Sequence, residues 1–211
     1  MNLTELEYKL KECHKYEYKW HKKQNDKVDR MTDNIVYDKS LNSVESLRNR
    51  ITDLNISDQE TRNYIFNRWY NHHSAMGIEY IFSKYNNVKK MSNEKHKTID
   101  FYIDGIPFDH KTTILPKNYR NNIKRALNNK EELVKWLYTN QSGERRQHYK
   151  NRLFLVVFDS DKKNKHWKVK AEISLIQEKV NEYMNSFSES NLIVLNLESQ
   201  KVYADVIFVI K

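Results

Sequence analysis

The chain contains very little cysteine, glycine or proline. Its 211 residues include one cysteine, three glycines and two prolines. The single Cys13 excludes an intramolecular disulfide and a zinc site built from cysteines, and it is typical of proteins from a reducing compartment. Because glycine and proline interrupt helices and strands, their scarcity indicates a chain that consists mostly of regular structure.

Long apolar runs are also missing. The longest, Leu153–Phe158, is far shorter than the roughly 20 residues that a membrane-spanning helix needs. The amino-terminal segment alternates charged and apolar residues, which is unlike a secretory signal. We therefore expect a soluble, cytoplasmic protein that does not interact with membranes.

Charge is unbalanced toward the basic side. The sequence has 37 lysines and arginines against 28 aspartates and glutamates, a formal net charge of +9. A surplus of this size favours polyanionic partners and salt-sensitive association. The length suits one domain, or one domain with an appendage.

Two amphipathic helices are predicted at the amino terminus. The T-x-x-E pattern from Thr4 is a capping box, and the helix that it begins is predicted to run to about Met31. Apolar residues three or four positions apart indicate the second helix: Leu41, Val44, Leu47, Ile51 and Leu54. We expect a helical hairpin over residues 1–56, turning near residues 32–39, appended to an α/β core over residues 57–211. Such a hairpin could form a dimer surface, grip DNA, or only pack against the core.

The core is predicted to contain a tight β-hairpin. Asp104-Gly105 favours a two-residue type I′ turn, because both central positions of that turn need a positive φ. This turn determines which residues face each other across the two strands. The predicted pairs are Ile103–Ile106, Tyr102–Pro107, Phe101–Phe108 and Asp100–Asp109.

The two faces of this hairpin differ in chemistry. Side-chain alternation places one apolar set toward the core: Phe101, Ile103, Ile106 and Phe108. It places Asp100, Asp109 and Lys111 on the opposite face. Opposed carboxylates, with Cβ atoms about 4.5–5.5 Å apart, repel each other unless a cation lies between them, and a hard divalent ion prefers oxygen ligands. The plainer alternative is that solvent hydrates the two acids and that Lys111 is an ordinary surface lysine.

A third acid lies on a predicted helix upstream. The S-x-x-E pattern from Ser57 predicts a helix that begins near Asp58, with an interruption or kink at Gly77. Glu79 lies among apolar residues of this helix, and a buried unpaired charge is costly. Either a salt bridge with a nearby lysine or arginine or a place in a metal site would satisfy it.

These residues resemble the PD-(D/E)xK nuclease superfamily, which has the restriction-endonuclease-like fold. A helix glutamate is followed, about twenty residues later, by Asp-x8-Asp-x-Lys on a hairpin. Glu79 matches the helix acid, Asp100 and Asp109 the two strand acids, and Lys111 the lysine. Ile99 occupies the position where the family often has proline. The resemblance implies an α/β fold with a central mixed β-sheet flanked by helices.

The resemblance covers about residues 60–160 and implies a Mg²⁺-dependent endonuclease, with Mn²⁺ as a substitute. Its expected substrate is DNA, with RNA left open, and restriction or phage defence is the expected setting. The metal ligands that it implies are Glu79, Asp100, Asp109 and the backbone carbonyl of His110. Lys111 would orient the attacking water or stabilise developing negative charge. Small enzymes of this kind often act as homodimers, with one active site for each strand.

Two basic, polar clusters are candidates for nucleic-acid contacts. They consist of Tyr119, Arg120, Lys124 and Arg125, and of Arg145, Arg146, Gln147 and Lys150. The first cluster begins a predicted helix, whose free N–H groups can hold a phosphate. The second precedes a predicted strand, and a solvated loop is its plainer interpretation. His72 and His73, together with His110, could be taken for a zinc site, but adjacent histidines on a helix point in different directions.

The rest of the core is predicted to alternate helices and strands. The expected elements are an edge strand near residues 88–91, a helix over 116–138, a strand over 152–159, a helix over 172–186 and strands over 192–197 and 202–210. Two other functional classes remain open. One is a nucleic-acid-binding module with a degenerate nuclease site, and the other is a structural or interaction protein.

Overall fold

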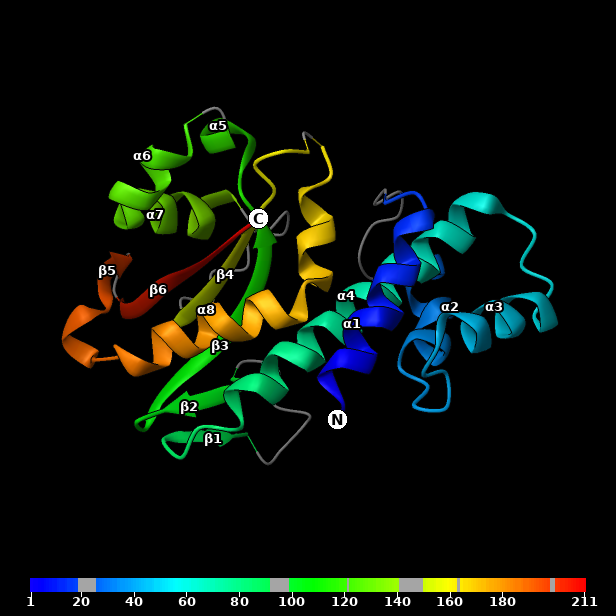
Figure 1. Ribbon diagram of the computed structural model, residues 1–211, viewed down its shortest axis with the longest axis horizontal. Helices are drawn as coiled ribbons and strands as arrows, with labels where there is room; N and C mark the ends of the chain where they lie inside the picture. The colour runs from blue at the N-terminus through cyan, green and yellow to red at the C-terminus, as the bar shows by residue number, and fades with distance from the viewer. Residues whose placement is uncertain (19–25, 92–98, 121, 141–149, 163, 198–199) are drawn as a thin grey trace. The chain divides into compact units, whose positions relative to one another are not determined.

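Figure 1 shows the computed structural model, which describes residues 1–18, 26–91, 99–120, 122–140, 150–162, 164–197 and 200–211. The chain divides into two compact units, Met1–Ile78 with Lys170–Ser174, and Glu79–Val169 with Leu175–Lys211. The sequence suggests a domain boundary between residues 56 and 57, and that boundary stays a prediction.

The first unit is helical. Its helices are α1 (Leu3–Glu12), α2 (Lys27–Val36), α3 (Val44–Asp53) and most of α4 (Gln59–Phe82). The expectation of one helix from Thr4 to about Met31 is wrong, because α1 ends at Glu12. The expected turn near residues 32–39 is also misplaced, because α2 occupies much of that segment. The second predicted helix is confirmed as α3, whose buried residues include Leu47 and Ile51.

A tertiary contact accompanies the end of the first helix. After a 3₁₀ turn at Cys13–Lys15, the backbone of Tyr16 becomes extended, with φ −90° and ψ 150°. The Tyr16 ring stacks on the Phe66 ring, with centroids 3.7 Å apart. Helix propensity in this segment is therefore overridden by packing against α4.

Two helix starts differ from the capping patterns in the sequence. The side chain of Asn2 caps α1 by accepting a hydrogen bond from the Glu5 N–H at 3.2 Å. At the start of α4, Asp58 accepts from the Thr61 N–H at 2.9 Å. Asn and Asp are good N-cap residues, so in both places the cap lies away from the first residue of the predicted box, Thr4 or Ser57.

Gly77 does not interrupt α4, which runs without a break from Gln59 to Phe82. A Cβ atom at Gly77 would lie 2.5 Å from Cδ2 of Leu6 in α1. The glycine therefore permits a close approach between two helices of the first unit rather than a kink.

A buried arginine ties α2 to α4 in the same unit. The guanidinium of Arg68 contacts Asp29 (Nε to Oδ1, 3.2 Å) and Asp33 (Nη2 to Oδ1, 2.6 Å). It also donates to the Asp29 carbonyl at 2.7 Å and to Thr32 Oγ1 at 2.6 Å. Tyr64 donates its hydroxyl proton to Asp29 at 2.7 Å. These bonds satisfy a charge that would otherwise be costly to bury.

The second unit contains a mixed β-sheet of six strands in the order β1-β2-β3-β4-β6-β5. The strands are β1 (Val88–Lys90), β2 (Phe101–Ile103), β3 (Ile106–Ile114), β4 (Arg152–Phe158), β5 (Ile193–Leu197) and β6 (Gln200–Ile210). β1, β2 and β3 pair antiparallel, β3, β4 and β6 pair parallel, and β5 pairs antiparallel with β6. The α/β fold with a central mixed sheet and helices beside it is as expected, including each predicted strand.

The single helix expected over residues 116–138 is wrong. Three short helices cover this region: α5 (Lys117–Arg120), α6 (Ile123–Asn128) and α7 (Lys130–Asn140). Asn122 accepts a hydrogen bond from the Arg125 N–H at 3.1 Å, and Asn129 accepts from the Glu132 N–H at 3.2 Å. Asparagine side chains compete with backbone acceptors in this way, and each begins a new helix here. The helix expected over residues 172–186 is confirmed as α8 (Ile173–Asn185).

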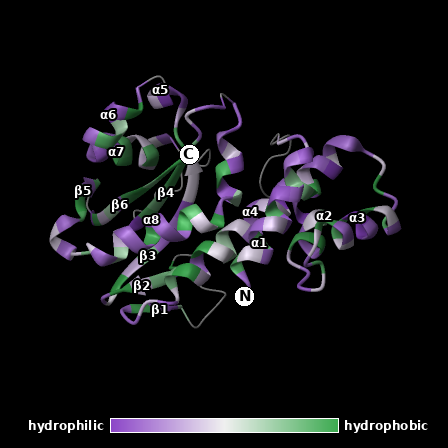
Figure 2. Ribbon diagram, viewed as in Figure 1, coloured by the Kyte–Doolittle hydropathy of each residue, from purple (hydrophilic) through white to green (hydrophobic). Residues whose placement is uncertain are grey.

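The core of the second unit is built around β4. One buried cluster joins Leu133 and Leu137 of α7 to Phe154 and Val156 of β4. The intervening Leu155 is also fully buried, so both faces of the strand are covered, as is usual for parallel strands. Figure 2 shows β6, the next strand of the sheet, as a hydrophobic ribbon. None of the described helices combines the length and apolar character that crossing a membrane requires.

Candidate active site

The hairpin forms with the register that the sequence predicts. The turn residues Asp104 and Gly105 have φ values of 49° and 83°, as a type I′ turn requires. The strand pairs are Phe101–Phe108, Tyr102–Pro107 and Ile103–Ile106. Phe101, Ile103 and Phe108 are buried and Ile106 is half-buried, so the apolar face is as expected.

The direct pair between Asp100 and Asp109 is not formed. β2 begins at Phe101, and the N–H of Asp100 donates to the Phe108 carbonyl at 2.9 Å. The Asp100 carboxylate accepts a hydrogen bond from the His110 N–H, with Oδ2 2.6 Å from the nitrogen. The His110 N–H lies beyond the end of β2, and the Asp100 carboxylate gives this donor a partner. Asp100 is thus anchored beside β3 by one backbone and one side-chain hydrogen bond.

Asp109 and Lys111 lie on the same face of β3, as alternation predicts. Lys111 Nζ is 2.7 Å from Asp109 Oδ1, and Arg152 Nε is 3.5 Å from Asp109 Oδ2. The Asp109 side chain is 10% exposed, whereas that of Lys111 is 46% exposed. Asp109 is therefore a nearly buried carboxylate with a cation on each side, one of which can reach solvent.

The surroundings of Asp100 disfavour the ionised form of its carboxyl. Burial raises the pKa of its carboxyl, and the neighbouring charge of Asp109 raises it further. The His110 N–H, Lys111 and Lys90 act in the opposite direction without cancelling the increase. The two acids therefore share one electrostatic environment although they are not a strand pair.

Glu79 joins this environment from the last turn of α4. Burial raises the pKa of its carboxyl, and the charge of Asp100 adds to the effect. Lys90 and Lys111 lower that pKa in part, and Lys90 Nζ lies 3.7 Å from Glu79 Oε2. Of the two partners expected for Glu79, the structure contains the lysine salt bridge, and Asp100 is close enough to influence the same carboxyl.

His110 faces away from these acids. Its ring lies 6.2 Å from the rings of both Phe82 and Phe101. Burial lowers the pKa of His110 to about 3, so the imidazole is neutral near pH 7. Its backbone carbonyl, rather than its ring, was the ligand implied by the resemblance, and that role stays a prediction.

The three carboxylates that the resemblance implies as metal ligands, Glu79, Asp100 and Asp109, are not arranged as a three-ligand metal site. Among the described residues, no group of three or more His, Cys, Asp and Glu side chains is arranged to hold a metal ion. Mg²⁺, however, is commonly bound through only one or two carboxylates, with water and substrate phosphates completing its shell. Burial, and then a neighbouring carboxylate, raise the pKa values of Asp100 and Glu79, and a bound cation would lower both.

Arg152 also belongs to this cluster, although it was not among the site residues expected from the sequence. It is the residue of β4 that neighbours Asp109 in the parallel ladder. Its guanidinium carbon lies 4.8 Å from the centre of the Tyr138 ring. In the sequence, Arg152 is only a charged residue at the start of a predicted buried strand. Its position beside Asp109 follows from the strand order.

The first basic cluster follows the carboxyl end of β3, whereas Asp109 lies nearer the start of that strand. Tyr119 is buried and donates its hydroxyl proton to Glu132 at 3.1 Å. Arg125 forms an ion pair with the same glutamate. Arg120 Nε donates to the Leu115 carbonyl at 2.8 Å. These three side chains therefore have intramolecular partners, while Lys124 is exposed.

Most of the second basic cluster lies outside the described residues. Arg145, Arg146 and Gln147 belong to that undescribed segment. Lys150 is described, and its carbonyl accepts a hydrogen bond from the Tyr138 hydroxyl at 2.5 Å. Nucleic-acid contacts by either cluster stay a prediction.

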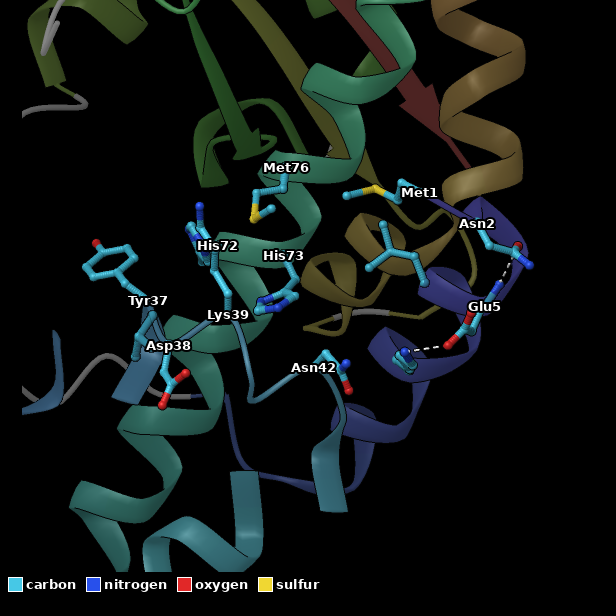
Figure 3. Close-up of a pocket in the computed structure, with 13 residues that line it drawn as sticks. Met1, Asn2, Glu5, Tyr37, Asp38, Lys39, Asn42, His72, His73 and Met76 are labelled. Atoms are coloured by element: carbon cyan, nitrogen blue, oxygen red, sulfur yellow. Dashed lines mark hydrogen bonds and ion pairs between the residues drawn. The ribbon is translucent and has the colours of Figure 1, made fainter. Parts of the chain in front are cut away.

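The first unit contains a separate cavity of about 330 Å³, shown in Figure 3. Met76, His72 and His73 of α4 line it together with Met1 and Tyr37. Burial lowers the pKa values of both histidines, that of His73 to about 4. Their rings are 5.3 Å apart at 86°, so they point in different directions as expected, and His110 belongs to the other unit.

No family model matches the chain, and no curated protein or solved structure shows significant similarity to it. The resemblance to the PD-(D/E)xK nucleases therefore stays a prediction based on Glu79, Asp100, Asp109 and Lys111.

Proposed function

We propose that the protein is a divalent-metal-dependent nuclease that hydrolyses phosphodiester bonds in DNA, with restriction or phage defence as its setting. One observation carries the proposal. Glu79, Asp100, Asp109 and Lys111 come from a helix end, a strand approach and a strand, yet they form one electrostatic cluster. Perturbed carboxyls gathered beside a lysine are typical of sites that bind metal and activate water.

The carboxylates would have distinct tasks. Asp100 and Asp109 would hold Mg²⁺ or Mn²⁺, and Glu79 would add its charge from α4. A bound divalent ion lowers the pKa of water and polarises a phosphate. The hydrogen bond from the His110 N–H fixes the direction of the Asp100 carboxylate, which keeps its other oxygen for a ligand.

Lys111 suits a role at the reacting phosphate. Its ammonium group touches Asp109 but its side chain is nearly half exposed, so it can also donate to a molecule in solvent. There it would orient the attacking water or stabilise charge that develops on the phosphate oxygens. The net charge of +9 would favour the approach of a polyanion.

The order of elements supports the same proposal. α4 is followed by the antiparallel strands β1, β2 and β3, and β4 then pairs parallel with β3. This gives a central mixed sheet with an acid-bearing helix before it, which is the arrangement that the resemblance implies.

The decisive experiment is incubation of purified protein with plasmid DNA, linear DNA and RNA, in EDTA and in Mg²⁺ or Mn²⁺. We expect cleavage only with metal, and none by Asp109→Asn. Asp104→Asn is the matched control, because it makes the same change in the hairpin turn, where asparagine is equally suited. No metal-dependent cleavage by the wild type, or cleavage that persists in Asp109→Asn, would rule the proposal out.

The net charge also favours a second candidate, a nucleic-acid-binding module with a degenerate site. Such a protein would show a salt-dependent gel shift without cleavage in any metal. A structural or interaction protein would show neither.

A further inference from the structure

Arg152 is a nearly buried arginine whose hydrogen bonding is incomplete. Its side chain is 13% exposed. Its Nε is buried and has no hydrogen-bond partner among the described residues. Asp109 Oδ2 lies 3.5 Å from this Nε, and the pair is not a hydrogen bond. Buried donors are nearly always paired, so one that is not calls for a missing partner.

Asp109 does not fill that gap. Its Oδ1 already contacts Lys111 Nζ at 2.7 Å, a distance typical of a charge-assisted hydrogen bond. The Lys111 ammonium therefore supplies much of the counter-charge for this carboxylate. Arg152 Nε is left beside this carboxylate without a hydrogen bond to it.

The guanidinium packs against the ring of Tyr138. The ring centre lies 4.8 Å from the guanidinium carbon, within the range of a cation–π contact. The Tyr138 hydroxyl donates to the Lys150 carbonyl at 2.5 Å, and its ring meets Phe154 edge-on with centroids 5.6 Å apart. Arg152 is thus pre-positioned, which lowers the entropic cost of binding a ligand.

We propose that Arg152 binds a phosphate group of the nucleic-acid substrate beside Asp109, with Tyr138 as its positioning residue. A guanidinium presents donors in a planar fork that matches two phosphate oxygens. Phosphate oxygens would also satisfy the buried Nε. The inference rests on the proposed nuclease function and names one substrate contact within it.

The test measures binding of a short DNA duplex, and of an RNA strand of the same sequence, by fluorescence anisotropy. EDTA prevents metal-dependent cleavage during the measurement. The affinity is followed between about 50 and 200 mM KCl, because each phosphate contact contributes about 0.9 to the slope of log K against log salt for duplex DNA. Arg152→Gln should weaken binding and reduce that slope by about one contact. Arg152→Lys should restore the slope but only part of the affinity, because lysine lacks the fork.

Lys135→Ala is the matched control, since it also removes one positive charge. Lys135 is exposed in α7 and its ammonium contacts Glu131 at 2.5 Å, so the control should keep the wild-type slope. An unchanged slope in Arg152→Gln would overturn the proposal, and so would an equal loss in Lys135→Ala. Thermal melts establish that each variant is folded. If Arg152→Gln does not fold, Arg152→Lys decides, and wild-type affinity in that variant would overturn the fork contact.

The outcomes separate this proposal from the nuclease proposal. Cleavage lost in Asp109→Asn with an unchanged slope in Arg152→Gln would refute only the Arg152 contact. Binding without cleavage by the wild type, combined with a reduced slope in Arg152→Gln, would refute only the nuclease proposal. A wild-type protein that binds neither probe would overturn the Arg152 contact.

Discussion

Two acid-to-amide substitutions in the same site should change stability in opposite directions. Asp100→Asn should stabilise the folded protein near neutral pH in the absence of metal, whereas Asp109→Asn should destabilise it. The contrast follows from their partners. Asp109 has a cation on each side, and Asp100 has raised pKa through burial and the charge of Asp109.

The magnitude for Asp109→Asn comes from what the change leaves behind. Breaking a buried ion pair usually costs about 3–5 kcal/mol, because one charge stays buried without a partner. Lys111 is nearly half exposed and can be hydrated again, so only the buried Arg152 loses its neighbour. We therefore expect a loss of about 1–3 kcal/mol in the free energy of unfolding.

Asp100→Asn removes a charge that the fold disfavours. The amide oxygen of asparagine can still accept from the His110 N–H. A pKa that is raised in the folded state costs about 1.4 kcal/mol per unit when the group is ionised. That cost is absent below the ordinary Asp pKa of 3.8. It grows as pH rises toward the folded-state pKa and is constant above it. The stabilisation by asparagine should therefore increase with pH and then level off.

Urea unfolding of the wild type and both variants, in EDTA between about pH 4 and pH 8, measures these effects. Changes of the same sign for the two variants near neutral pH would refute the electrostatic account of the site. So would a gain for Asp100→Asn that is largest at the acid end of the range.

Three further predictions concern the metal, the lysine and the first unit. Mg²⁺ or Mn²⁺ at ten times its dissociation constant should stabilise the wild type by about 1.4 kcal/mol; thermal melts should show this shift, and an equal shift in Asp109→Asn would contradict the assigned ligand. Lys111→Ala should slow cleavage about 100- to 1000-fold with little change in nucleic-acid affinity, as single-turnover assays and gel shifts will measure; undiminished cleavage would remove Lys111 from the site. Arg68→Met should lower the free energy of unfolding by about 3–5 kcal/mol, because it leaves Asp29 buried without its cation. Adding Asp29→Asn should recover part of that loss, as urea unfolding will measure. A loss below about 1 kcal/mol in Arg68→Met would mean that the pair contributes no more than a surface pair.

Local patterns predicted much of the second unit. The Asp104-Gly105 turn determined the strand register, because a two-residue turn leaves no freedom in which residues oppose each other. The apolar run in β4 correctly indicated a buried strand. Helix ends were predicted less well. The backbone is extended at Tyr16, whose ring stacks on Phe66, and no local pattern in the sequence indicates this contact.

The candidate site divides in the same way. Spacing alone brought Asp109 and Lys111 to one face of one strand, because alternation is a local property of the backbone. It overstated the pairing of Asp100, which lies beyond the end of β2 and bonds through its side chain. The spacing did not show where pairing ends, because β2 begins only at Phe101.

By itself the sequence determined the turn, the faces of the hairpin and the chemistry of the acids and lysine along it. Only the tertiary structure decided that Arg152 lies beside Asp109, and that Glu79 senses the charge of Asp100. Asp109 and Arg152 lie on β3 and β4, two parallel strands. Parallel strands are linked by a long crossover connection. Such pairing depends on the packing of the intervening helices, and no short-range pattern specifies it.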